Sequence, residues 1–113
     1  MNRNKLINMF IANLSNAIVH DILEKSIDKE ELKNHYDAEY SNFVKIAIKY
    51  REKINPVNFP LPDKDIKYII DKIKRNVMNE LMLRISKGYK GINLNLVDEY
   101  VSKELKKVRV LEW

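Results

Sequence analysis

The 113-residue sequence contains no cysteine and no threonine. Without cysteine there is no disulfide framework, and no metal site with cysteine ligands can form. Its only glycines are Gly88 and Gly91, so the chain lacks a glycine-rich loop of the kind that binds phosphate. Two glycines and three prolines are also too few for a fold with many turns. This composition favours a small number of long helices.

Long apolar runs are missing as well. Asn8, Asn13 and Asn16 interrupt the apolar segment that starts at Leu6, which is unlike the continuous core of a signal peptide. No stretch of 18 consecutive apolar residues occurs, so the sequence predicts no membrane-spanning segment and no membrane partner. We therefore expect a cytoplasmic protein, which the lack of cysteine also permits.

Apolar residues recur at steps of three and four in four segments, and this spacing is typical of helices with one buried face. The pattern predicts helices over residues 4–25, 29–54, 64–87 and 96–107. The turn around Ser26 to Asp28 is short, so the first two helices should be antiparallel neighbours. With no internal repeat, residues 1–113 are expected to form one all-α domain, a four-helix antiparallel bundle-like fold.

The predicted helix ends carry recognisable capping residues. Asp63 and Asn95 stand at N-cap positions, and Asp28 followed by Glu31 resembles a capping box. Gly88 is expected to stop the third helix, because glycine adopts the left-handed conformation without a steric clash. Between the second and third helices, residues 55–62 contain all three prolines. This Pro-rich loop should lie across the core and cover it with its apolar side chains, Phe59 and Leu61.

The residues that could support catalysis are poorly arranged for it. His20 and His35 flank the first turn, each with a glutamate four residues away, Glu24 and Glu31. Di-metal bundles use Glu-x-x-His, a spacing of three, so we expect no metal and no cofactor. The serines lack an oxyanion-hole motif. The sequence therefore predicts a protein that is not an enzyme and has no evident small-molecule substrate.

Three aromatic residues of the second predicted helix, Tyr36, Tyr40 and Phe43, follow helical spacing. Two interpretations are open: a surface on which nucleic-acid bases stack, or a buried face whose hydroxyls reach solvent. We favour the buried face, because aromatic residues at helical spacing usually mark one.

The net charge of +5 is concentrated in one part of the chain. Residues 63–90 hold eight basic and four acidic side chains, an excess of four. This basic flank is either a solvated face that keeps the protein soluble, which we favour, or a surface that neutralises nucleic-acid phosphates. The residues expected to bind nucleic acid under the second interpretation are Lys64, Lys67, Lys74, Arg75, Lys87 and Lys90.

The third predicted helix is more apolar in its second half than one packing face requires. The last residues of the chain, 108–113, are also apolar, and they either end the fourth helix or form a short extended arm. Either the two sets cover each other, or they bind another protein chain. The leading hypothesis is a non-catalytic protein-interaction or homo-oligomerisation module. Its expected partner-binding residues are Met78, Met82, Leu83, Val110, Leu111 and Trp113.

Overall fold

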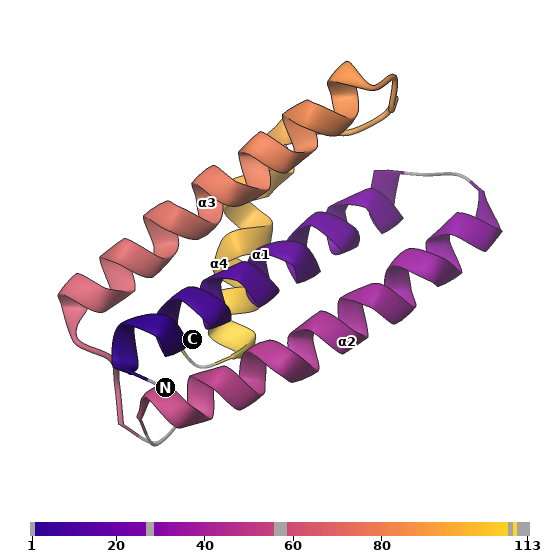
Figure 1. Cartoon of the computed structure of the whole chain (residues 1–113). Coiled ribbons are helices and arrows are strands. Elements are labelled where there is room, and N and C mark those ends of the chain that lie inside the picture. The colour runs from indigo at the N-terminus through magenta and orange to yellow at the C-terminus, as the bar shows by residue number, and fades with distance from the viewer. Residues whose placement is uncertain (1, 27–28, 56–58, 109, 111–113) are drawn as a thin grey trace.

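The computed structural model describes residues 2–26, 29–55, 59–108 and 110. In this part of the chain there are four α-helices, one short 3-10 helix and no strand (Figure 1). The all-α, bundle-like fold class is therefore confirmed, and each α-helix ends within one residue of its predicted bounds. The elements are α1 (Arg3–Ser26), α2 (Glu30–Ile54), α3 (Asp63–Ser86), η1 (Leu94–Leu96) and α4 (Val97–Lys107).

Helix α1 lies at the centre of the fold. It packs against each of the other three α-helices, with α2 on one side, α3 on the other and α4 crossing behind it (Figure 1). Its apolar side chains at helical spacing, such as Phe10, Leu14, Ile18 and Ile22, are completely buried. Each such side chain contributes on the order of 2 kcal/mol to folding, so α1 supplies much of the core.

The composition of α1 bears on the expectation that no segment could cross a membrane. By length and mean hydropathy alone α1 could cross a membrane, because its asparagines are polar but uncharged. Within the fold, however, 61% of that apolar window is buried. Burial by three neighbouring helices accounts for a composition of this kind.

Helices α1 and α3 run in the same direction. A guanidinium nitrogen of Arg3 lies 2.6 Å from a carboxylate oxygen of Asp65, and the Tyr68 hydroxyl lies 3.1 Å from the amide oxygen of Asn8. Both pairs join the first turns of the two helices, which requires a parallel arrangement. Helices adjacent in sequence are antiparallel, as expected, but the α1–α3 pair at the centre of the fold is not (Figure 1).

The helix ends differ from the sequence prediction in detail. Asp63 is the first residue of α3 rather than its cap, and Pro62 precedes it. Asn93 takes the place expected for Asn95: its side-chain oxygen accepts from the Asn95 amide at 3.0 Å, because the 3-10 turn η1 precedes α4. Gly88 does end α3, with a φ of 100°. The predicted cap at Asp28 lies outside the described residues.

The Pro-rich loop covers the core only in part. Leu61 is buried, as expected, but Phe59 is 59% exposed. Nearby, the guanidinium of Arg51 is buried and donates to the backbone carbonyls of Asn55 and Phe59, at 3.3 and 3.4 Å. Burial lowers the pKa of Arg51. This arginine therefore joins the end of α2 to the loop.

After α4 the chain folds back onto the core. Val108 and Val110 are both buried, and the Val110 amide donates to the Leu105 carbonyl at 2.8 Å. The arm is thus packed on its own chain as far as Val110. Leu111 and Trp113, the other residues of the predicted arm, lie outside the described residues.

Candidate functional site

The last two turns of α3 expose large apolar side chains. Met82 is 54% exposed, Leu83 47% and Ile85 40%, whereas Val77 and Leu81 in the same part of the helix are completely buried. The buried residues already complete the contact of α3 with the core. At 100° per residue Met82 lies between Leu83 and Ile85, so the three exposed side chains are spread around the outer part of α3 rather than along one face; we call them the α3 apolar surface.

The other residues predicted to bind a partner are placed differently. Met78 is half-buried and packs against the core, and Val110 is buried within it. Neither residue is therefore fully available to a partner in this conformation. Of the six predicted residues, the structure brings Met82 and Leu83 together on the surface, and Leu111 and Trp113 lie outside the described part of the chain.

A groove of about 360 Å³ runs between α1 and α3, next to the α3 apolar surface. Along each helix the lining residues follow the spacing i, i+3, i+4, i+7, which places them on one face. The walls are Ala12, Ser15, Asn16 and Val19 of α1 and Asn76, Asn79, Glu80 and Leu83 of α3. We call this the α1–α3 groove.

Two polar features of the α1–α3 groove stand out. The Ser15 side chain is 4% exposed, and its hydroxyl has no hydrogen-bond partner among the described residues. Such a buried hydroxyl costs about 1–3 kcal/mol when it stays unpaired. Glu80, the one charged residue of the lining, lies 3.2 Å from Arg84 in the next turn, so its charge is neutralised within α3.

A second hollow, of about 700 Å³, lies where the α1–α2 turn meets the α3–α4 loop. Leu32, Tyr36 and Tyr89 contribute its apolar lining, and Lys29 and Lys90 stand beside them. Tyr36 is buried, and this burial, together with the neighbouring Tyr89, raises the pKa of Tyr36. The Tyr36 hydroxyl therefore stays protonated at neutral pH, which does not suit it to act as a base.

The predicted nucleic-acid-binding residues do not converge on one place. Lys64, Lys67 and Arg75 are exposed along α3, whereas Lys87 and Lys90 follow its far end. A helix of 24 residues spans roughly 36 Å, so the two groups are well separated. Lys74 is engaged within the fold, since its ammonium lies 3.3 Å from Asp98 of α4.

A buried polar cluster joins α4 to α1 and α2. Glu104 is completely buried, and the Tyr40 hydroxyl donates to its two carboxylate oxygens, at 2.8 and 3.0 Å. The Lys107 ammonium donates in turn to that hydroxyl at 2.7 Å. Lys103 donates to the buried carboxylate of Asp21 at 2.9 Å. Each carboxylate thus has a donor, and the cluster holds α4 across the back of α1.

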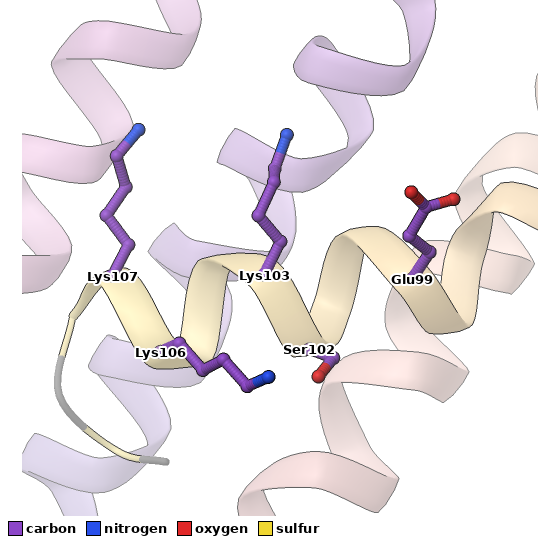
Figure 2. A pocket seen from close by; sticks show the side chains of 5 residues that line it. All are labelled: Glu99, Ser102, Lys103, Lys106 and Lys107. Atoms are coloured by element: carbon purple, nitrogen blue, oxygen red, sulfur yellow. The ribbon is translucent and has the colours of Figure 1, made fainter. Parts of the chain in front are cut away.

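The lysines of this cluster border a shallow hollow on α4, shown in Figure 2. Lys103 and Lys107 extend toward α1 and α2, while Lys106 and Ser102 leave the helix on other sides. The ammonium groups therefore do not converge on one point, as an anion-binding site would require. Burial and the hydrogen bond to Glu104 raise the pKa of Tyr40, whereas a catalytic tyrosine base needs a lowered pKa. The geometry favours a structural role for the cluster.

The two histidines both contact Tyr36, with ring centroids 5.6 Å away for His20 and 5.5 Å for His35. In His20, Nδ1 lies 2.6 Å from the Asn16 carbonyl, so this nitrogen carries a proton and donates it. Among the described residues, no three histidine, aspartate or glutamate side chains gather as metal ligands would.

Sequence reasoning missed Asp21, Glu104 and Ser15. Each had a signal, because all three occupy positions on the apolar face of their helix: Asp21 lies one turn after Ala17 and Ile18, and Glu104 one turn after Val101. A charged or polar residue on a buried face needs a partner.

Comparisons of the chain with protein-family models, curated proteins and solved structures found no match.

Proposed function

We propose that this protein is a non-catalytic interaction module that self-associates through the α3 apolar surface. The observation that carries the proposal is the exposure of Met82, Leu83 and Ile85 within about one helical turn at the end of α3. Contiguous apolar side chains on a folded surface are typical of protein–protein contacts. Methionine is also adaptable, so it packs well against irregular partner surfaces.

The titratable groups support a binding role rather than catalysis. The buried carboxylates of Asp21 and Glu104 are engaged by Lys103 and Tyr40 within the fold. The raised pKa values of Tyr36 and Tyr40 keep both hydroxyls protonated at neutral pH. Neither these carboxylates nor these hydroxyls therefore combine an open position with the activation that a nucleophile or base requires.

Sedimentation equilibrium tests the proposal. The wild-type protein should show an average mass above that of the monomer, and Met82→Glu should shift it to the monomer, because a carboxylate in an apolar contact loses its hydration. The matched control is Ile46→Glu, which places the same charge at an exposed apolar position on α2. A wild-type protein that remains monomeric at its highest soluble concentration would rule out self-association.

A second candidate function is contact with nucleic-acid phosphates. It is favoured by the exposure of Lys64, Lys67 and Arg75, none of which forms an ion pair with another described residue. Binding through such residues should weaken steeply as salt rises. Lys64→Glu with Lys67→Glu should reduce retardation of DNA or RNA in a gel, and Lys45→Glu with Lys49→Glu on α2 is the control. Absence of retardation at low salt would exclude this function.

A further inference from the structure

We infer that the hollow between the start of α2 and the α3–α4 loop binds a small planar aromatic molecule that carries an anionic group, such as a carboxylate or a sulfonate. We call it the α2–loop hollow. The described residues that line it are Ser26, Lys29, Leu32, Tyr36, Gly88, Tyr89, Lys90 and Gly91. This binding is separate from self-association, because none of the lining residues belongs to the α3 apolar surface.

The α2–loop hollow has the size of a small-molecule site. Its volume of about 700 Å³ falls within the usual range of roughly 300–1,000 Å³ for such sites. On one side, Leu32 and Tyr36 lie one turn apart on a single face of α2, and Lys29 precedes them by a further turn. The loop residues form the other side. A ligand in this position contacts two segments that are far apart in the sequence.

Two tyrosines give the hollow a fixed aromatic lining. The buried ring of Tyr36 packs against His20 and His35, with ring centroids 5.6 and 5.5 Å away. Tyr89 is 38% exposed, and the guanidinium of Arg84 lies over its ring, 5.5 Å from the centroid. Burial, and then the hydrogen bond to Tyr89, raise the pKa of Tyr36, so the two hydroxyls lie close together. Rings held in this way lose little freedom when a ligand packs on them.

The charged residues among the described lining are both cations. Lys29 and Lys90 are exposed, and neither forms an ion pair with another described residue. Glu30 and Glu31 follow Lys29, but at 100° per residue they point roughly 120° or more away from the face that carries Leu32. An anionic group in the hollow is therefore attracted by both lysines, whereas a cationic group is repelled.

The loop offers bare backbone to a ligand at Gly88. A Cβ atom added there would have no atom within 4 Å, so the space next to this residue is open. At Gly91 an added Cβ would lie 3.0 Å from the Ser26 carbonyl oxygen, so the loop is held against the end of α1. The loop side of the hollow is thus open at one glycine and anchored at the other, and a flat ring can lie close to its backbone.

The lining favours an aromatic anion over either of its parts. An inorganic anion leaves Leu32 and Tyr89 exposed to water, and a neutral ring leaves the charges of Lys29 and Lys90 unused. Exposed lysines each contribute little to affinity. We therefore expect the ring to supply most of the binding and the anionic group to set its orientation.

Naphthalene-2-sulfonate is a suitable probe, because it joins a flat apolar ring system to a permanent negative charge. Its dissociation constant, measured by calorimetry, should be on the order of 1 mM or lower. Naphthalene-2-methanol, which has the same rings without the charge, should bind about threefold to tenfold more weakly, and methanesulfonate more weakly still. The inference is wrong if the sulfonate does not bind, or if either comparison compound binds as tightly.

The low glycine content allows the bound probe to be located by NMR. Protein labelled with ¹⁵N-glycine has two amide signals, from Gly88 and Gly91, and both residues line the hollow. Both signals should shift as the probe is added. The alanine amides, all outside the lining, should shift less in protein labelled with ¹⁵N-alanine. Binding that leaves both glycine signals in place would overturn the assignment.

Substitutions in the lining test the same site. Leu32→Trp fills the hollow and should weaken binding of the probe by about tenfold. Ile46→Trp, at a position of equal exposure on α2, is the matched control and should bind like the wild type. Lys90→Gln should weaken binding about threefold, and Lys45→Gln should not. Unchanged affinity in Leu32→Trp would refute the inference; if that variant does not fold, unchanged affinity in Lys90→Gln would do so.

Met82→Gln separates this site from the surface proposed for self-association. Because Met82 is outside the lining, the variant should keep the wild-type affinity for naphthalene-2-sulfonate. Loss of binding would mean that the probe occupies the α3 apolar surface, and the α2–loop hollow would then be the wrong site. A wild-type chain that is monomeric but binds the probe would contradict the proposed function and leave this inference standing.

Discussion

The Tyr40 hydroxyl donates a hydrogen bond to the buried carboxylate of Glu104, 64 positions later in the sequence. Glu104 is 0% exposed, so this bond supplies a donor where water cannot. Lys107 donates to the same hydroxyl, and its ammonium lies 5.2 Å from the centre of the Tyr40 ring. Helix α4 is thereby attached to α2, although α4 crosses behind α1 (Figure 1).

Tyr40→Phe should therefore destabilise the protein. The change removes the donor but leaves Glu104 buried, and a buried acceptor without its partner costs about 1–3 kcal/mol, or more when charged. The urea midpoint should fall accordingly. Tyr50→Phe is the control, since the Tyr50 hydroxyl has no hydrogen bond within the described residues. Equal stability of the two variants would show that the Tyr40–Glu104 bond contributes nothing.

Stability should also fall in alkaline solution. Burial, and then the hydrogen bond to Glu104, raise the pKa of Tyr40 above its ordinary value near 10. Below about pH 10 the folded and the unfolded chain both keep the proton of the Tyr40 hydroxyl. Above it the unfolded chain loses the proton first, so the contribution of Tyr40 is lost as pH rises through the folded pKa.

Deprotonation of Lys103 should also lower the stability of the fold in alkaline solution. Burial, the largest single effect, lowers the pKa of Lys103, but the hydrogen bond to Asp21 and the negative charges of Asp21 and Glu104 together outweigh it, so the pKa is raised. The urea midpoint should therefore stay constant up to about pH 9 and drop as the pH rises beyond about 10, and it should drop less in Tyr40→Phe. An identical decrease in the variant and the wild type would contradict the role given to Tyr40.

The two glycines should respond differently to alanine. Both have positive φ, so Gly88→Ala and Gly91→Ala each cost about 1 kcal/mol of backbone strain. At Gly91 a Cβ atom would also lie 3.0 Å from the Ser26 carbonyl oxygen, whereas at Gly88 the space is open. Thermal unfolding should show the larger loss for Gly91→Ala. The reverse order would mean that the α3–α4 loop does not approach the end of α1 so closely.

Shortening the C-terminal arm should separate folding from association. Removing residues 108–113 deletes Val108 and Val110, which are buried, and should cost about 3–5 kcal/mol of stability. Removing residues 111–113 spares both valines. If Leu111 and Trp113 bind a partner chain, this shorter deletion should lower the average mass in sedimentation equilibrium. An unchanged mass would exclude them from the contact.

The helices were predictable because each carries a complete apolar stripe within its own segment. Ile69, Ile73, Val77 and Leu81 lie four residues apart and are all buried, so local spacing alone identified the inner face of α3. The same spacing places Met82 and Leu83 outside that stripe, but it left open whether the C-terminal arm covers them.

The partners of each helix were not predictable from the same spacing. A periodic stripe states which face is buried but not what buries it, so the parallel α1–α3 pair left no local signal. The bond between Lys103 and Asp21 joins residues 82 positions apart. Likewise, the α1–α3 groove exists only because Ala12 and Asn76 come to face the same furrow, a property of two helices together.

The central position of α1 has a consequence for the order in which the fold can form during synthesis. α1 precedes the other helices in the chain, yet its Asp21 face is covered by Lys103 of α4, the last helix. The ribosome must therefore synthesise the chain as far as α4 before α1 is enclosed, and the side of α1 that faces α4 stays accessible meanwhile. Nascent chains stopped before α4 should be the forms most prone to aggregate or to recruit chaperones.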